Sequence, residues 1–384
     1  MKIGFLFNHD AIHQITHTAP IIAELVAKGA NVSVLTSSLE QEQRVRHFVP
    51  SGTPIHFIQL KTSKLVDIIN IIACGILPFR RLAILRQNLS IFADFDALIV
   101  PETTSTLLKS RYGLNNLKMI YLPHGAGDRA VGFQAVTRLF DFVLLSGSKV
   151  RDRMLADRLI TPDNHAIVGY PKFDTIDFSH TPRIFNNDRP TVLYNPHFDP
   201  QLSSWADMGE PILDYFAGQD QFNLIFAPHI MLFQRRIHTS LEHKRVRFRK
   251  MIPRRFTNLS HIHIDTGSTR SADMTYTRAA DIYLGDVSSQ IYEWIYRPRP
   301  CIFINSHNAS WQGNPNYAHW ALGEVINSVA ELPGALERAQ ASFPAFSQLQ
   351  ADAFRETFHM TGAPSPSKRA ADAIMEFLHR ASTP

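Results

Sequence analysis

The stretch that decides the fold runs from Ala279 to Asn305 and reads A-A-D-I-Y-L-G-D-V-S-S-Q-I-Y-E-W-I-Y-R-P-R-P-C-I-F-I-N. An apolar run at 282–284 is typical of a buried strand, and a second apolar run at 301–304 follows two prolines. The residues between the two runs have helical spacing. The order strand, turn, helix, strand predicts a parallel α/β unit.

The turn of this stretch carries polar side chains at a place suited to anions. Gly285 and Asp286 end the first apolar run, and Ser288 and Ser289 precede the helical pattern. Free backbone N–H groups and the dipole at a helix N-terminus attract phosphate, and hydroxyl groups there can add hydrogen bonds. The serines could instead simply cap the helix. The residues alone leave both interpretations open.

The same alternation of short apolar runs and helical patterns extends along the rest of the chain. It lapses at 175–190 into Asp, Asn, Pro and Arg, which predicts a linker. We therefore predict an α/β protein with two doubly wound, Rossmann-like domains that face a cleft. The predicted parts are an N-terminal domain (1–174), the linker (175–190), a C-terminal domain (191–363) and a C-terminal helix (364–384). The predicted strands are 2–7, 31–35, 55–58, 97–100, 118–122, 142–145, 166–168, 191–194, 223–227, 261–264, 282–284 and 301–304.

Composition predicts a folded cytoplasmic protein. The 384 residues are enough for two domains, and 45% hydrophobic with 19% charged residues is a globular balance. Two cysteines without a CxxC pair support neither a disulfide framework nor a zinc ribbon. The first residues, M-K-I-G-F-L-F, are too short for a signal sequence, and no run reaches the roughly 18 apolar residues of a membrane span. A net charge of +5 favours an anionic partner.

Two stretches stand apart from this pattern. Residues 65–77 are mostly apolar and precede several arginines, which fits a buried helix or a helix in a membrane interface. The basic tract, residues 234–256, holds nine Lys or Arg residues and one acid, Glu242. It fits either a solvated basic helix or attraction to anionic lipid at the inner face of the cell membrane, or to a polyanionic acceptor. Nucleic acid is disfavoured because the tract lacks interleaved aromatic residues for base stacking.

Two histidines follow predicted strands in equivalent positions of the two halves. His124 follows the run at 118–122 and precedes Gly125, and His229 follows the run at 223–227 and Pro228. A neutral imidazole can accept a proton from an attacking hydroxyl near pH 7. A single histidine is more often structural, but two at matching strand ends indicate function. Asp128, four residues after His124, is a further candidate for the base.

Several chemistries lack their sequence signatures. The chain contains no G-x-x-x-x-G-K-[ST], no G-x-G-x-x-G after its first strand and no G-x-S-x-G. These absences argue against a P-loop enzyme, a dinucleotide cofactor and an α/β-hydrolase. His9, His13 and His17 have four-residue spacing but fall in a predicted loop, so we expect no metal site and no cofactor.

Ordered blocks of the chain resemble CDP-glycerol glycerophosphotransferases, the teichoic-acid primases and polymerases with a two-domain GT-B-like fold. The blocks are H-G at 124–125, G-Y-P-K-F-D at 169–174, V-L-Y-N-P-H-F at 192–198, P-H at 228–229, A-D-I-Y-L-G-D-V-S-S at 280–289 and F-H-M-T-G-A-P-S-P-S-K-R at 358–369. Each block is weak alone, whereas their order and spacing are fairly specific. Asn195 and His197 depart from the family's pattern and become further cleft candidates.

The resemblance implies transfer of an alditol phosphate, with glycerol phosphate expected, from a CDP-alcohol such as CDP-glycerol to an acceptor hydroxyl that is lipid-linked or polymeric. CMP is released. It implies that the N-terminal domain serves the acceptor, with His124 as general base, and that the C-terminal domain binds the donor. His229 would stabilise charge on the diphosphate. The expected phosphate-binding residues are Asp286, Ser288, Ser289 and Arg369.

Two alternatives remain open from the sequence. One is a GT-B glycosyltransferase or sugar-nucleotide epimerase that uses a UDP- or GDP-sugar at the same diphosphate site. The other is a membrane-recruited nucleotide-binding protein with a degenerate site. Preference for cytidine over uridine or guanosine nucleotides would separate the first alternative from the phosphotransferase, and turnover would separate the second.

Overall fold

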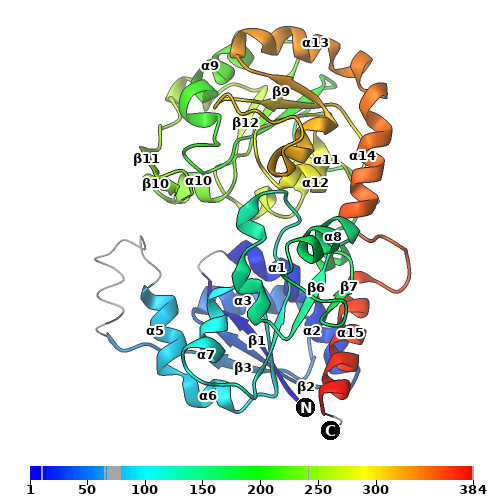
Figure 1. The fold of residues 1–384 in the computed structure, drawn as a ribbon. Coiled ribbons are helices and arrows are strands. Elements are labelled where there is room, and N and C mark those ends of the chain that lie inside the picture. Colours follow the sequence, from blue (N-terminus) through cyan, green and yellow to red (C-terminus); the bar gives the residue numbers. More distant parts are fainter. Residues whose placement is uncertain (10–11, 65, 67–78, 241, 383–384) are drawn as a thin grey trace. The chain divides into compact units, whose positions relative to one another are not determined.

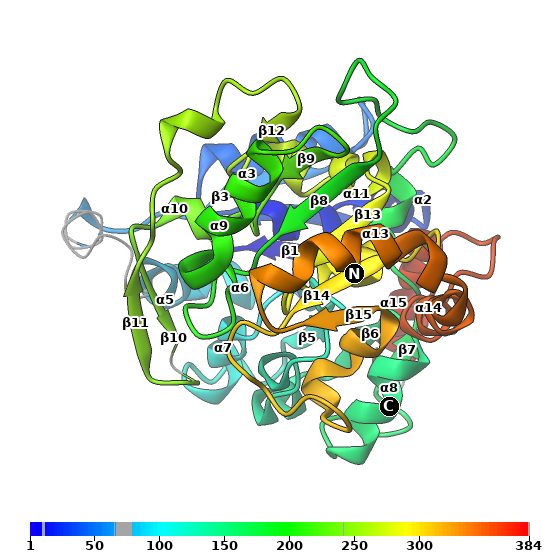
Figure 2. The same ribbon diagram turned by 90° about the horizontal axis from the view of Figure 1, so that it is seen from above.

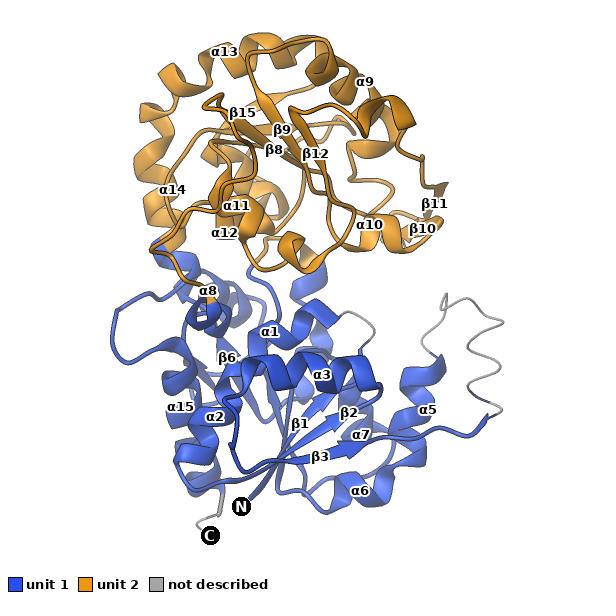
Figure 3. Ribbon diagram, turned by 180° about the vertical axis from the view of Figure 1, so that it is seen from behind, with its two compact units in different colours: residues 1–126, 131–175, 355–384 blue, residues 127–130, 176–354 orange. Residues whose placement is uncertain are grey.

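The structure is a computed structural model that describes residues 1–9, 12–64, 66, 79–240 and 242–382 (Figure 1). The chain divides into two compact units, which Figure 3 colours separately. Unit 1 comprises residues 1–126, 131–175 and 355–384, and unit 2 comprises residues 127–130 and 176–354. Each unit has its own parallel sheet.

The described residues of unit 1 form a seven-stranded parallel sheet in the order β3-β2-β1-β4-β5-β6-β7. Most of these strands are short apolar runs, and the central strand β4 is buried along its whole length because helices cover both faces of the sheet. Gly4 of β1 has no side chain because Leu98 and Leu35 occupy that space, 2.5 and 2.8 Å from the point where a Cβ atom would lie. The strands are β1 (Lys2–Phe7), β2 (Asn31–Thr36), β3 (His56–Gln59), β4 (Ala97–Val100), β5 (Lys118–Tyr121), β6 (Phe142–Leu145) and β7 (His165–Ile167).

Local signals set the ends of the helices in unit 1. Pro20 begins α2, and Gly29, with a φ of +80°, follows its end in a backbone conformation that favours glycine. Ser38 caps α3 because its hydroxyl accepts a hydrogen bond from the amide of Gln41. The helices are α1 (Ile15–Thr18), α2 (Pro20–Ala27), α3 (Leu39–Phe48), α5 (Phe79–Gln87), α6 (Leu89–Ala93), α7 (Leu107–Ser110), α8 (Ser148–Ala156) and α15 (Pro366–Ser382).

Unit 2 has a six-stranded parallel sheet among its described residues, in the order β12-β9-β8-β13-β14-β15 (Figure 2). The strands are β8 (Thr191–Asn195), β9 (Asn223–Phe226), β12 (Ile262–Ile264), β13 (Ile282–Gly285), β14 (Cys301–Ile304) and β15 (Glu324–Ile326). The helices are α9 (Trp205–Ala217), α10 (Met231–Gln234), α11 (Thr275–Ala279), α12 (Gln290–Trp294), α13 (Leu332–Ser342) and α14 (Pro344–Thr357), the last of which contains the boundary between the units.

Both units also contain short 3₁₀ helices between the strands and α-helices. They are η1 (Ile12–Gln14), η2 (Thr104–Thr106), η3 (Ala130–Gly132), η4 (Ala135–Leu139), η5 (Pro171–Thr175), η6 (Arg254–Phe256), η7 (Thr269–Ser271), η8 (Pro315–Leu322) and η9 (Val329–Glu331).

The units differ in three places from the predicted domains. The chain after Arg355 belongs to unit 1, whereas the sequence placed residues up to 363 in the second domain and a separate helix after them. The reason is the apolar stripe Ala370, Ile374 and Leu378 of α15, which is buried in the core of unit 1. The second difference is residues 127–130, which follow β5 in sequence but belong to unit 2. The third is the predicted linker, of which residues 176–190 belong to unit 2.

The centre of the basic tract is a β-hairpin, so the prediction of a solvated basic helix was wrong. β10 (Ile237–Ser240) pairs antiparallel with β11 (Arg245–Phe248), apart from the six-stranded sheet. The helical interpretation failed because alternating Arg, Val, Arg and Phe has the period of a strand. The apolar stretch 65–77 lies outside the described residues except for position 66. In the part of the chain that the structure describes, no helix has the length and hydrophobicity of a membrane span.

Candidate functional site

Counted along each sheet, the strand order is 3-2-1-4-5-6-7 in unit 1 and 3-2-1-4-5-6 in unit 2. The order 3-2-1-4-5-6 is that of dinucleotide-binding folds. Ligands of such sheets bind beyond the carboxyl ends of the strands where the order reverses. In unit 1 the reversal lies between β1 and β4, and in unit 2 between β8 and β13. These two strand-end regions are the candidate sites, one in each unit.

In unit 1, His124 lies at the carboxyl end of β5 in a fixed tautomer. Its Nδ1 is 2.9 Å from the carbonyl oxygen of Pro101, which follows β4. A carbonyl can only accept, so Nδ1 carries the proton. Nε2 then has a lone pair, which faces the side-chain amide nitrogen of Gln14 at 3.2 Å. Removal of water from around the ring lowers the pKa of His124 below 6.5, against the opposing effects of the Pro101 carbonyl and the Glu102 charge. The arrangement is that of a neutral base.

Groups that follow two other strands, β1 and β4, lie near this histidine. Glu102 follows β4, and its carboxylate accepts hydrogen bonds from the amides of Thr104 and Ser105 at the start of η2. His17 of α1, after β1, lies with its ring centroid 6.5 Å from that of His124. Burial lowers the pKa of His17 well below 6.5, so it too is neutral. Sequence reasoning missed Gln14 and Glu102, because neither belongs to a recognisable motif.

In unit 2, Asp286 was expected to bind phosphate, and the structure gives it a different role. Its side chain is fully buried. One carboxylate oxygen accepts from the amides of His197 (2.9 Å) and Val287 (2.6 Å). The other accepts from the amide (2.7 Å) and hydroxyl (2.9 Å) of Ser204. Burial raises the pKa of Asp286 to about 6 despite these bonds. Asp286 therefore joins the end of β13 to the loop between β8 and α9, and has no oxygen left for a ligand.

The two serines after Asp286 have different environments. The hydroxyl of the buried Ser288, which precedes the N-cap residue Ser289, accepts a hydrogen bond at 3.3 Å from the amide of Gln290, the first residue of α12, and so caps that amide. Ser289 is exposed, and its side chain makes no capping bond. A side chain at Gly127, a residue of unit 2, would place its Cβ 3.0 Å from the Cβ of Ser289. The capping interpretation thus holds for Ser288, and the hydroxyl of Ser289 is the one that could reach a ligand.

Two further histidines of unit 2 have the opposite tautomer to His124. Nδ1 of His229 accepts from the amide of Met231 at 3.2 Å, and Nδ1 of His197 accepts from the amide of Asp199 at 3.0 Å. In the neutral rings Nε2 must carry the proton and can donate. The ring centroids of His197 and His229 are 5.4 Å apart, and the ring of Phe198 lies against both. Burial lowers the pKa of His197 well below 6.5.

Asp128 is not placed as a free base, because it belongs to a buried network in unit 2. Its carboxylate accepts from the hydroxyl of Tyr292 at 2.6 Å and from Nδ1 of His319 at 2.9 Å. Nε2 of His319 lies 3.2 Å from the carbonyl oxygen of Asp286, which also accepts from the indole of Trp320 at 2.8 Å. The sequence offered no signal for Tyr292 or His319, since His319 is 191 residues from Asp128.

Three other candidate residues contact other parts of the protein or are buried. They are Asn195, Pro228 and Arg369. The amide of Asn195 donates to the carbonyl of Ala227 at 2.7 Å, and its oxygen accepts from Tyr283, so it braces three strand ends. Pro228 is buried. Arg369 lies on α15 in unit 1. Its guanidinium donates to the carbonyls of Val168 (3.0 Å) and His359 (2.7 Å), so Arg369 connects the segment after β7 to the segment before α15. Phosphate binding by Arg369 stays a prediction.

Gly125 is half-buried in the loop after His124. Within the described residues, no group of three or more His, Cys, Asp or Glu side chains is arranged to hold a metal ion.

The fold has counterparts among solved structures. A UDP co-structure of MnaA from S. aureus matches with a TM-score of 0.59 and 13% identity, over 98% of this chain and 97% of that one. The wall teichoic acid polymerase TagF, soaked with CDPG, matches with a TM-score of 0.62 and 12% identity, over 100% and 90%. The UDP-GlcNAc 2-epimerase from Neisseria meningitidis bound to UDP-GlcNAc matches with a TM-score of 0.57 and 12% identity, over 99% and 100%.

At these identities the likeness establishes the fold alone. The chain has the two-unit parallel α/β fold that is shared by GT-B glycosyltransferases and epimerases, as the sequence predicted. No protein-family model and no curated protein matches the sequence.

Proposed function

We propose that the chain is a transferase that moves an alditol phosphate, glycerol phosphate in the first instance, from a CDP-alcohol to an acceptor hydroxyl. The observation that carries the proposal is His124, a neutral histidine at the carboxyl end of β5 whose Nδ1 is held by a carbonyl and whose Nε2 has a lone pair. This is the state that a general base needs. The ordered sequence blocks and the fold shared with TagF support the choice of donor.

In the proposed reaction the acceptor oxygen attacks the β-phosphorus of the donor. A new P–O bond forms, the P–O bond to CMP breaks, and the hydroxyl proton passes to Nε2 of His124. Unit 2 binds the donor: the exposed hydroxyl of Ser289 and the Nε2–H of His229 donate hydrogen bonds to the diphosphate as charge moves to the leaving CMP. The acceptor is a hydroxyl on a lipid-linked or polymeric molecule, and the reaction serves the synthesis of a cell-envelope polymer or glycolipid. Positioning and charge stabilisation provide most of the catalysis.

A second candidate is a GT-B glycosyltransferase or epimerase that uses a UDP-sugar. The S. aureus and N. meningitidis neighbours favour it, since both were solved with uridine ligands. The hydrogen-bond donors of unit 2 suit any nucleoside diphosphate, so the base and the transferred group must separate the two candidates.

Calorimetry with CDP-glycerol, CDP-ribitol, CMP, UDP and UDP-GlcNAc tests the proposal. We expect the cytidine ligands to bind at least about tenfold more tightly than the uridine ligands, a difference of about 1.4 kcal/mol. Tighter binding of UDP-GlcNAc would support the epimerase or glycosyltransferase instead. Release of CMP from CDP-glycerol only when a hydroxyl acceptor is present would then distinguish a transferase from a protein that merely binds nucleotides.

A further inference from the structure

The outer face of the β10–β11 hairpin is apolar, which is unusual for so basic a segment. In the register of the hairpin Ile237 lies opposite Phe248, and Thr239 lies opposite Val246. Residues that face each other across antiparallel strands share one face. The exposed fractions of Ile237, Val246 and Phe248 are 42%, 64% and 78%, so this face points to solvent. Met251, just after β11, is 70% exposed.

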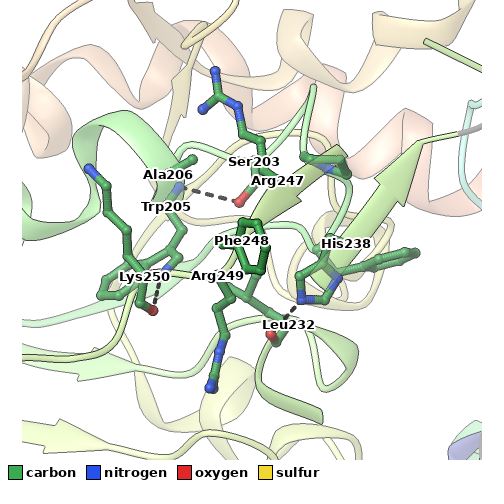
Figure 4. Close-up of a pocket in the computed structure, with 11 residues that line it drawn as sticks. Ser203, Trp205, Ala206, Leu232, His238, Arg247, Phe248, Arg249 and Lys250 are labelled. Atoms are coloured by element: carbon green, nitrogen blue, oxygen red, sulfur yellow. Dashed lines mark hydrogen bonds between the residues drawn. The ribbon is translucent and has the colours of Figure 1, made fainter. Parts of the chain in front are cut away.

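The opposite face of the hairpin is fastened to unit 2. His238 is buried, and its Nε2 donates to the carbonyl of Leu232 at 2.8 Å (Figure 4). Arg247 forms an ion pair with Asp207 of α9 at 2.7 Å. The indole of Trp205 donates to the carbonyl of Lys250 at 3.1 Å (Figure 4). These bonds fix which face is outward, so the apolar side chains cannot turn inward without breaking them.

Exposed cations lie next to the apolar residues along the chain. These cationic side chains form no ion pair among the residues that the structure describes. The only acid of the basic tract, Glu242, pairs with Arg129 at 2.9 Å and so does not neutralise them. Arg247 and Arg249 are not part of this free set, because the first pairs with Asp207 and the second donates to the carbonyl of Phe233. The free set is Arg235, Arg236, Lys244 and Lys250. Arg245 is also exposed, but it lies opposite Ser240 on the other face of the hairpin.

We propose that this hairpin face docks on an anionic lipid bilayer, with Val246, Phe248 and Met251 entering the interface and the free cations contacting lipid phosphates. Charge complementarity selects an anionic partner, because each exposed Lys or Arg near an anionic membrane surface contributes to binding. The apolar side chains select a bilayer over a dissolved polyanion, because only the bilayer removes them from water. Four of the twelve large hydrophobic side chains that are exposed among the described residues lie between 237 and 251. The proposal does not depend on the transferase reaction, and its failure would leave the proposed function untouched.

Vesicle flotation with the full chain separates the two contributions. On vesicles of phosphatidylcholine with about 30% phosphatidylglycerol, we expect Val246→Ser with Phe248→Ser to lower the partition coefficient by about tenfold or more, although the charge is unchanged. Leu349→Ser, which removes an exposed apolar side chain outside the hairpin, is the control. Arg235→Gln with Arg236→Gln should lower binding by about tenfold or more, and raised salt should do the same. Arg111→Gln with Lys368→Gln removes two exposed charges of unit 1 as its control.

A Phe248→Trp variant reports insertion directly. Its fluorescence should shift to the blue and be quenched by brominated lipid on anionic vesicles but not on phosphatidylcholine alone. Heparin, a soluble polyanion, should bind without that change. Two outcomes would overturn the proposal that the partner is a bilayer and would indicate a soluble polyanion instead. One is vesicle binding by the Val246→Ser, Phe248→Ser variant that equals that of the unchanged protein. The other is binding to heparin with no blue shift on vesicles. Circular dichroism of each variant excludes unfolding as the cause.

Discussion

At the scale of single residues, backbone groups determine what each strand-end histidine can do. A carbonyl, that of Pro101, faces Nδ1 of His124 and leaves Nε2 as an acceptor. Amides, those of Met231 and Asp199, face Nδ1 of His229 and His197 and leave Nε2 as a donor. One histidine is thus prepared to take a proton and two to give hydrogen bonds. The proposed division between base and diphosphate-binding groups follows from this difference.

Replacement of His124 tests whether it is the general base. His124→Ala should lower turnover by about 10²–10⁴, the usual contribution of a general base, with little change in donor affinity. His47→Ala, which removes an exposed histidine of unit 1, should leave turnover unchanged. Because desolvation lowers the pKa of His124, the acid limb of the kcat/KM profile should lie below pH 6.5, with activity lost as the ring becomes protonated. Near-normal turnover of His124→Ala, or an acid limb above about pH 7, would show that another group is the base.

The paired serines allow a sharper comparison, since only one of them is exposed. Ser289→Ala should weaken binding of CMP and CDP-glycerol by about fivefold or more, as loss of a charge-assisted hydrogen bond does, with unchanged stability. Ser288→Ala should instead lower the free energy of unfolding by about 0.5–2 kcal/mol through loss of the cap. Calorimetry and urea denaturation measure the two effects. If the variants exchange these outcomes, the assignment of cap and ligand group is reversed.

At the scale of elements, Asp286 holds the strand ends of unit 2 together. Its carboxylate accepts from the loop between β8 and α9 and from the end of β13, and its carbonyl accepts from η8 through Trp320. The family resemblance made Asp286 a candidate for binding phosphate. The signal for its real role, a set of backbone donors 82 and 89 residues away, exists only in the fold.

Asp286→Ala should therefore destabilise unit 2 by about 3 kcal/mol or more, because buried donors lose their acceptor. Asp281→Ala, which removes an exposed acid that accepts one amide bond from Thr191, should cost less. The folded-state pKa of about 6 lies above the usual 3.8, so the contribution of this carboxyl is complete below pH 3.8 and declines as pH rises through about 6. The penalty of Asp286→Asn should accordingly shrink from about pH 4 to about pH 7 in urea titrations. A penalty that grows with pH would refute the raised pKa.

At the scale of the whole molecule, the fold could be predicted because buried parallel strands are continuous apolar runs. Ala97–Val100 and Cys301–Ile304 have the bounds that their residues indicated. The missed elements lack that signal: β15 is only E-V-I, and β11 alternates arginine with apolar residues. His124 and His229 lie at strand ends as expected, whereas Gln14, Ser204, Tyr292 and His319 have no motif and act through partners distant in sequence.

The C-terminal helix α15 belongs to unit 1, so a change in its buried face should act on that unit. Ile374 of α15 is fully buried in the core of unit 1, so Ile374→Asp places an unpaired carboxylate there. We expect it to destabilise unit 1 by more than about 4 kcal/mol, the range in which a buried charge unfolds a domain. His379→Asp, on the exposed side of the same helix, is the matched control. Limited proteolysis should cut residues of unit 1 first, while unit 2 resists and keeps its affinity for CMP. Loss of both units in a single transition would show that the chain end stabilises the whole protein, not unit 1 alone.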